Sequence, residues 1–314
     1  MYSQHRSTML FIALATLLCM PSLMDSSSLG TSSATGQTIS HEPNAASEIL
    51  LGNTYTHAER WPEAIEAYKR AIELDHRAAA AYGNLGHAYC RLGQFSEARV
   101  SLERAISLEP TNANFKYNLG NAYLNMHLVP EAIEMLEQAI RLNREYFQAY
   151  NDLGNAYAEV SCYREAIDSL KQAVRLQPNS SLEYYNLAVT YYDSSRFKEA
   201  AKTLKQAIVL DHQYIAAYST LGLVYLNLRR YGAAAEALEY VVSFNPADVR
   251  AHYHLGMAYL GLKQNELFWQ QYECVKNLES QMAVRMHDAF YNDRLLILAR
   301  KDNSPPQARE RQMQ

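Results

Sequence analysis

The sequence predicts an all-α fold, an αα-solenoid built from repeated helix pairs. Pro and Gly are sparse after the first 45 residues and runs of β-branched residues are rare, which favours helices over strands. A Leu-Gly pair, once Leu-Ala, recurs every 34 residues without an insertion, as expected of a two-helix repeat unit. The pairs begin at Leu51, Leu85, Leu119, Leu153, Leu187, Leu221 and Leu255.

Each unit carries further residues at fixed positions. A tyrosine follows three residues after the pair, and in six of the units an alanine follows nine residues later, as in Tyr55 and Ala64. Small residues such as Gly52 and Ala64 allow the two helices of a unit to cross closely. Pro62 falls at the first turn of a second helix, where a missing N–H costs little.

These in-register units resemble the tetratricopeptide repeat family. The seven units are residues 45–78, 79–112, 113–146, 147–180, 181–214, 215–248 and 249–282. The resemblance implies helix pairs stacked into a right-handed superhelix, in which neighbouring repeats share the burial of their apolar faces. Phe268 replaces the repeat alanine in the seventh unit, so we expect that unit to be splayed or adapted to an end position.

The N-terminal segment, residues 1–24, has a different character. His5 and Arg6 precede an apolar run, Met9–Met20, which is too short to span a bilayer and is typical of a secretory signal peptide. We therefore expect an exported protein, periplasmic or extracellular. An uncleaved membrane anchor and an apolar N-terminus of a cytosolic protein are the alternatives.

Three more segments lie outside the repeats. Residues 25–44 are rich in Ser, Thr, Gly and Ala and predict a disordered linker. Residues 283–301 have an amphipathic pattern and predict a capping helix, because the last repeat of an array needs a cover. Residues 302–314 are polar and predict a disordered tail.

The cysteines do not form a disulfide framework. Cys90, Cys162 and Cys274 are far apart in sequence and odd in number, so they predict small buried side chains or, alternatively, one reactive thiol. Cys19 would suit a lipoprotein, but Leu18 stands where such a site needs a small residue.

Composition and motifs argue against several functions. A net charge of -4 without a long basic run does not indicate nucleic-acid binding. No phosphate-binding loop or H-E-x-x-H motif occurs, and His252 and His254 diverge on a helix. We therefore predict no catalytic residues, no metal and no cofactor, and a chain that is not an enzyme.

The resemblance directs attention to the first helix of each repeat, which lines the concave face in the family. The sixth position holds Asn or Asp in four consecutive repeats: Asn84, Asn118, Asp152 and Asn186. The ninth holds Asn or His in the first four: Asn53, His87, Asn121 and Asn155. Side-chain amides match the donor and acceptor of a peptide bond, so this row predicts a groove that grips an extended backbone.

Aromatic residues accompany the amides, and we expect Tyr117, Tyr185 and Tyr192 to add contacts. The row of amides at the sixth position is similar to the asparagine ladder of the repeat domain of O-linked N-acetylglucosamine transferases. The alternative is that the amides bridge adjacent helices or hydrate a polar surface.

Another groove of the same family, the chaperone-tail clamp, fits poorly. Asn53 and Asn84 match its amides, but Ile49, Asn114 and Asn118 stand where it needs cations. The last three repeats instead offer an apolar groove, comprising Val189, Leu223, Leu226, Met257 and Leu260. The apolar groove of these repeats suggests either that the partner carries an apolar anchor or that the protein forms homo-oligomers through them.

The function predicted from these patterns is an exported protein–protein interaction scaffold that binds an extended polypeptide or peptide partner. The alternative is an accessory subunit of a glycosyltransferase or of a cell-envelope assembly or secretion complex. An enzyme is the third possibility, but it would need a catalytic domain outside the repeats.

Overall fold

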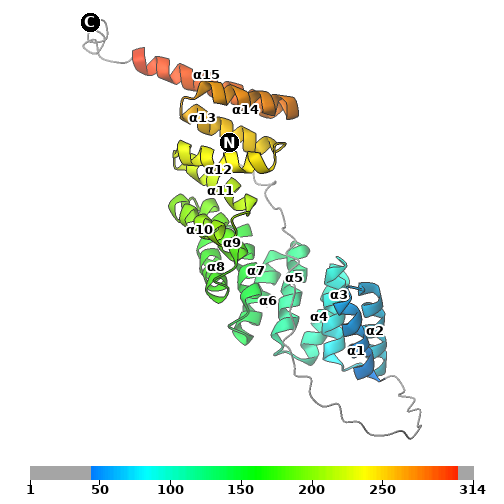
Figure 1. Ribbon diagram of the computed structural model, residues 1–314. Helices are drawn as coiled ribbons and strands as arrows, with labels where there is room; N and C mark the ends of the chain where they lie inside the picture. Colours follow the sequence, from blue (N-terminus) through cyan, green and yellow to red (C-terminus); the bar gives the residue numbers. More distant parts are fainter. Residues whose placement is uncertain (1–43, 303–314) are drawn as a thin grey trace, which may run out of the picture. The chain divides into compact units, whose positions relative to one another are not determined.

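The computed structural model describes residues 44–302, with side chains for 44–279 and 281–292. The predicted signal or anchor segment, nearly all of the linker, and the tail beyond residue 302 lie outside this range. The described range contains fifteen helices and no strand, so the all-α fold is confirmed. Figure 1 shows them following one another in chain order as antiparallel pairs.

The first helix of each pair is called here the A helix, and the second the B helix. The A helices are α1 (Ala45–His57), α3 (Ala79–Arg91), α5 (Ala113–Asn125), α7 (Phe147–Glu159), α9 (Ser181–Asp193), α11 (Ile215–Asn227) and α13 (Val249–Gly261). The B helices are α2 (Trp61–Leu74), α4 (Phe95–Leu108), α6 (Val129–Leu142), α8 (Tyr163–Leu176), α10 (Phe197–Leu210), α12 (Tyr231–Phe244) and α14 (Asn265–Leu278). The last helix is α15 (Ser280–Asp302).

Close helix crossing explains the recurring small residues. A Cβ added at Gly154 of α7 would lie 2.5 Å from Cγ of Leu170 in α8, far inside van der Waals contact. The partner positions are equally tight, because Ala166 and Leu170 are both fully buried. A side chain at Gly154 would therefore require Leu170 or the helices of this repeat to shift, although the fifth repeat accommodates Ala188 at the equivalent position.

The turn inside each pair contains one left-handed residue. Gly93 has a φ of 73°, and the equivalent residues of the other six repeats are not glycine. They are Glu59, His127, Ser161, Ser195, Arg229 and Lys263, with φ between 56° and 63°. Left-handed backbone is costly for residues with a Cβ, so the packing of the helix pair imposes it.

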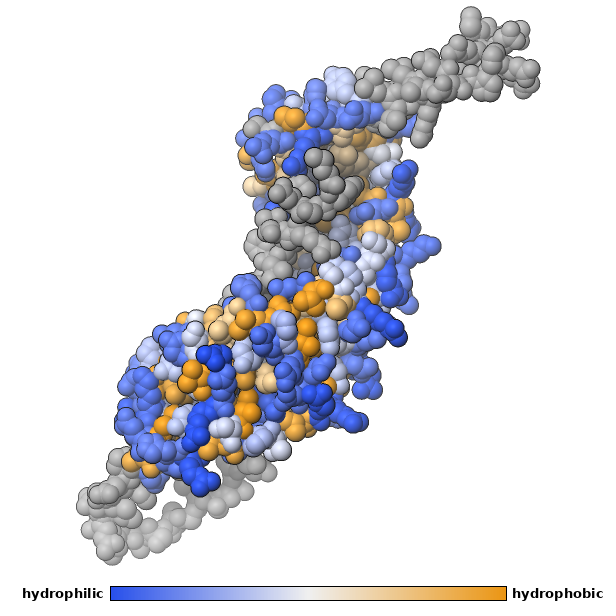
Figure 2. Space-filling model, turned by 180° about the vertical axis from the view of Figure 1, so that it is seen from behind, coloured by the Kyte–Doolittle hydropathy of each residue, from blue (hydrophilic) through white to orange (hydrophobic). Residues whose placement is uncertain are grey.

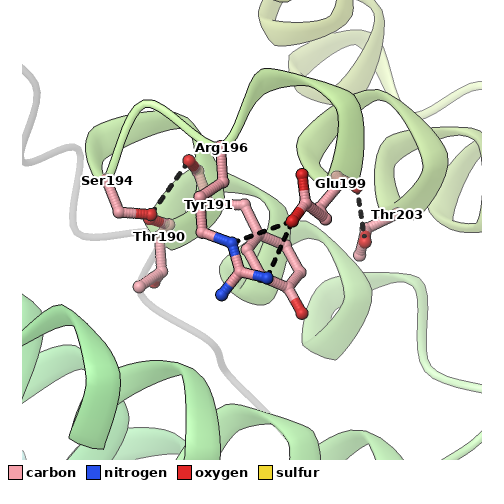
Figure 3. Close-up of polar contacts among 6 residues, drawn as sticks. All are labelled: Thr190, Tyr191, Ser194, Arg196, Glu199 and Thr203. Atoms are coloured by element: carbon pink, nitrogen blue, oxygen red, sulfur yellow. Dashed lines mark hydrogen bonds and ion pairs between the residues drawn. The ribbon is translucent and has the colours of Figure 1, made fainter.

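Polar contacts fix the A helix onto its B helix near this turn. In Figure 3 the guanidinium of Arg196 lies over the ring of Tyr191, 4.9 Å from its centroid. The same group donates from Nε and Nη2 to Oε1 of Glu199, at 2.9 and 2.7 Å. Equivalent stacks join Arg60 to Tyr55 and Arg230 to Tyr225.

Other tyrosines of the repeat signature connect neighbouring repeats. The hydroxyl of Tyr157 donates a 2.7 Å hydrogen bond to Glu137 of the preceding repeat, and Tyr259 bonds Glu239 in the same way. The tyrosine of the signature therefore ties repeats together, besides filling space between the helices of one repeat.

The hydrophobic core is continuous in one half only. One cluster extends from Ile167 in α8 to Phe290 in α15. Between Ala64 and Leu153 the core is divided into four smaller clusters. The two halves of the array therefore differ in how much buried apolar surface their repeats share.

The two ends of the array also differ. Leu51 in α1 is 37% exposed, whereas its equivalents, such as Leu85, lie against a preceding repeat and are buried. At the other end Phe268 is fully buried and stacks on Phe290 of α15, with ring centroids 5.2 Å apart. The large residue of the seventh repeat thus fills the junction with α15, which is its adaptation to an end position.

None of the helices in the described range is long and apolar enough to cross a membrane. On the face seen in Figure 2, apolar residues form short strips separated by hydrophilic surface.

Candidate peptide-binding face

The predicted groove residues lie on the A helices of the first five repeats. Successive A helices contact one another from α1 to α9, so their side chains form neighbouring rows. We call this surface the A-helix face. It comprises Asn53 of α1, Asn84 and His87 of α3, Tyr117, Asn118 and Asn121 of α5, Asp152 and Asn155 of α7, and Tyr185, Asn186 and Tyr192 of α9.

The first two repeats are joined by an amide pair. Nδ2 of Asn84 donates a 2.9 Å hydrogen bond to Oδ1 of Asn53, which also accepts from the Tyr68 hydroxyl at 2.8 Å. Thr56 lies 2.9 Å from the same hydroxyl. These two asparagines therefore bridge adjacent helices, as the alternative interpretation of the sequence proposed.

A second bridge joins the fourth and fifth repeats. Nδ2 of Asn186 donates a 2.8 Å bond to Oδ1 of Asn151, and Asn151 in turn donates weakly to Asp152, at 3.4 Å. Asn151 was not among the predicted site residues. Its position, next to Asp152 on the same helix, was the only signal in the sequence.

Asp152 is the centre of a polar cluster. Burial raises its pKa to about 6, and hydrogen bonds from Tyr117, Asn151 and Asn121 oppose the rise. Asn121 is itself held by Asn125, whose amide donates to the Asn121 carbonyl oxygen at 2.9 Å. Three predicted residues, from α5 and α7, are therefore brought together here.

Glu183 of α9 is a further residue that the sequence analysis missed. Its side chain is only 4% exposed, and its Oε2 is buried without a hydrogen-bond partner. Burial, and then the negative charge of Asp152, raise its pKa to about 7. A signal was present, since the equivalent residue of most repeats is a buried alanine such as Ala149 or Ala217.

The predicted aromatic contacts are partly used inside the protein. Tyr117 packs on Tyr146 with ring centroids 4.8 Å apart, and Tyr185 packs on Tyr214 at 5.1 Å. Tyr192 meets Phe197 edge-on within its own repeat, at 5.7 Å. Each of these rings therefore spends part of its surface on a contact within the protein.

Other predicted residues keep more freedom. Asn118 is half-buried and Asn155 is exposed, and neither side chain hydrogen-bonds to another described residue. His87 lies edge-on to Trp61 at 5.9 Å, and burial followed by the charge of Arg91 lowers its pKa. The unbonded amides of Asn118 and Asn155 are therefore available to a ligand.

The apolar residues of the last three repeats are half-buried. Leu226 and Leu260 pack against the continuous core, so part of their surface is used in holding the repeats together. Val189, Leu223 and Met257 are also half-buried.

These helix pairs and their conserved crossing geometry define a helical repeat scaffold of the αα-solenoid class. A family model described as "TPR repeat" matches residues 52–93, 86–126 and 190–228. A second, described as "Tetratricopeptide repeat", matches residues 117–181 and 219–271. The chain belongs to the tetratricopeptide repeat proteins, whose scaffold serves protein–protein interaction.

Solved structures give the same result. YrrB, described as a TPR protein with an unusual peptide-binding site, is 25% identical with a TM-score of 0.50, over 55% of this chain and 89% of YrrB. A MamA protein is 26% identical with a TM-score of 0.50, over 54% of this chain and 92% of that one. Pseudomonas aeruginosa pilF is 17% identical with a TM-score of 0.57, over 66% of this chain and 94% of pilF. At this identity the similarity shows the fold alone. A search of curated proteins finds no match.

Proposed function

We propose that this chain is a non-catalytic scaffold that binds an extended polypeptide segment along the A-helix face. The observation that carries the proposal is the pair of unbonded amides, Asn118 and Asn155, on neighbouring helices α5 and α7. Each offers a donor and an acceptor that match a peptide bond. The resemblance to YrrB, which is described as having a peptide-binding site, supports the same reading.

Preorganisation supports the proposal further. The bridge from Asn84 to Asn53 holds α1 to α3, and the bridge from Asn186 to Asn151 holds α9 to α7, the helix that carries Asn155. A rigid face loses less entropy when it binds than a flexible one. Each amide bond to a ligand contributes only about 0.5–1.5 kcal/mol net, and the partner must be ordered, so we expect weak to moderate affinity.

Capture of partners by the tagged protein in its native host tests the proposal. The double variant Asn118→Ala with Asn155→Ala should keep its helical circular dichroism and retain less partner after crosslinking in the native host. Gln206→Ala is the matched control, because Gln206 is an exposed, unbonded amide on the B helix α10. Equal capture by the double variant and the control would contradict binding through the amides.

We also propose that the protein is exported, on the strength of the basic residues and apolar run within residues 1–24. A reporter enzyme that is active only after export, fused behind residue 44, should be active. Replacing the apolar run with polar residues should abolish that activity, and N-terminal sequencing of the exported fusion would separate a cleaved signal from an anchor.

A further inference from the structure

Glu183 is a charged residue in a position built for a small apolar one. The equivalent residues of four other repeats are alanines that are at most 2% exposed: Ala81, Ala149, Ala217 and Ala251. Glu183 is equally enclosed, at 4% exposed, and its buried Oε2 has no partner. A buried acceptor that bonds nothing is costly, so its presence needs a compensating interaction.

The charge that acts on Glu183 comes from a negative group, and none comes from a positive one. Glu183 and Asn186 are one turn apart on α9, and Asn186 bonds Asn151, which neighbours Asp152 on α7. The negative charge of Asp152 acts on Glu183 and raises its pKa. Within the described range, no Lys, Arg or His forms an ion pair with either carboxyl.

The other titratable groups near this pair are acidic or phenolic. Tyr117 donates to Asp152, and Tyr214 is affected by the charges of Asp211 and Glu183. The carboxylates of Asp152 and Glu183 would both be stabilised by one added cation, whereas the two phenols are neutral. Asp152 is half-buried and Glu183 is buried, so Asp152 is the more exposed residue of the two.

We propose that Asp152 and Glu183 form a receptor for one cationic side chain, a lysine or arginine, of the polypeptide that lies along the A-helix face. The proposal rests on the proposed function and names its partner class, a peptide with a basic residue. An ammonium or guanidinium group brings donors for Asp152 and, once the enclosed Glu183 carboxylate turns toward it, for Oε2. Charge-assisted bonds of this kind are the strong ones. A bare divalent ion fits less well, because calcium needs six to eight oxygens and this site has two carboxyls.

The inference is tested with acetylated, amidated random-sequence peptides that contain one lysine, against the same peptides with norleucine in its place. The wild-type protein should bind the lysine set about tenfold more tightly by fluorescence polarisation. Glu183→Ala should lose this preference while folding normally, because alanine is the residue of the equivalent repeats. Glu183→Gln, which keeps the shape of the side chain, should lose it too.

Controls separate this inference from the proposed function. Glu236→Ala removes an exposed acid on α12 and should retain the preference. Equal binding of lysine and norleucine peptides overturns the receptor and leaves peptide binding standing. Absence of binding to every peptide overturns both. Calorimetry with calcium chloride alone tests whether the pair binds a metal ion. Calcium binding by the wild type that is lost in Glu183→Ala would assign Asp152 and Glu183 to a metal ion and overturn the receptor.

Discussion

Asn84 of the second repeat donates its side-chain amide to Oδ1 of Asn53 in the first, at 2.9 Å, and the same oxygen accepts from the Tyr68 hydroxyl. One acceptor therefore serves two donors from two other helices. Amides on the A-helix face are structural at this end of the array, whereas Asn118 and Asn155 remain unbonded.

Replacing Asn53 with alanine should destabilise the N-terminal repeats. It leaves the part-buried donors of Asn84 and Tyr68 without their shared acceptor, which costs about 1–2 kcal/mol. Urea unfolding followed by circular dichroism measures the loss. Asn155→Ala, at an exposed and unbonded amide, should change the unfolding free energy by less than about 0.5 kcal/mol. A similar loss in both variants would refute the structural role of the Asn53 bridge.

The stability of the protein should fall as the pH rises from 5 to 8. Glu183 has its folded-state pKa raised from 4.5 to about 7, and Asp152 from 3.8 to about 6. A raised carboxyl pKa favours folding below the unfolded-state pKa, and that contribution is lost as the pH passes the folded-state value.

Glu183→Ala should flatten this pH dependence. Removing one buried carboxylate raises the unfolding free energy at pH 8 by an amount on the order of 1–3 kcal/mol, with little gain at pH 5. Thermal melts across this pH range measure the difference, and Glu236→Ala should follow the wild-type curve. A pH profile of Glu183→Ala parallel to the wild type would show that this carboxyl is not the titrating group.

Arg229→Gly should stabilise the protein by about 0.5–1 kcal/mol. Glycine adopts a left-handed backbone without the steric cost that arginine bears, and this gain exceeds the larger conformational entropy that glycine loses on folding. Arg229 has a φ of 56°, and Gly93 already occupies the equivalent turn of the second repeat. The reverse change, Gly93→Ala, should lower the melting temperature. Since a Cβ at Gly93 would meet nothing within 4 Å, any loss there reports backbone strain alone.

Phe268→Ala should cost about 3–5 kcal/mol of unfolding free energy, although alanine is the residue of the other repeats. The ring is fully buried and stacks on Phe290, so its removal leaves a cavity under α15. Val284→Ala on α15, at a side chain that is 58% exposed, should be nearly neutral in guanidinium unfolding. A loss below about 1 kcal/mol for Phe268→Ala would mean that α15 does not depend on this contact.

The sequence predicted the repeat architecture because helix crossing imposes the same small and large residues in every unit, such as Gly154 against Leu170. It did not predict the partners of the groove amides. Asn186 bonds Asn151 rather than the aspartate beside it, and that choice depends on the relative placement of α7 and α9. This placement leaves no trace in residue type.

Glu183 was overlooked for a different reason. The groove prediction rests on residues that equivalent positions share, and Glu183 is informative because it differs from the residues at its equivalent positions. Its alanine counterparts, such as Ala149 and Ala217, show that the position is enclosed, so a glutamate there stands out only when burial is considered together with residue type.

The division of the hydrophobic core has a mechanical consequence. Repeats that share one continuous cluster, from Ile167 to Phe290, lose their packing together, whereas repeats held by separate clusters between Ala64 and Leu153 can be released one at a time. A pulling force applied across the array should therefore produce several small extensions from the N-terminal repeats before one large rupture of the C-terminal block.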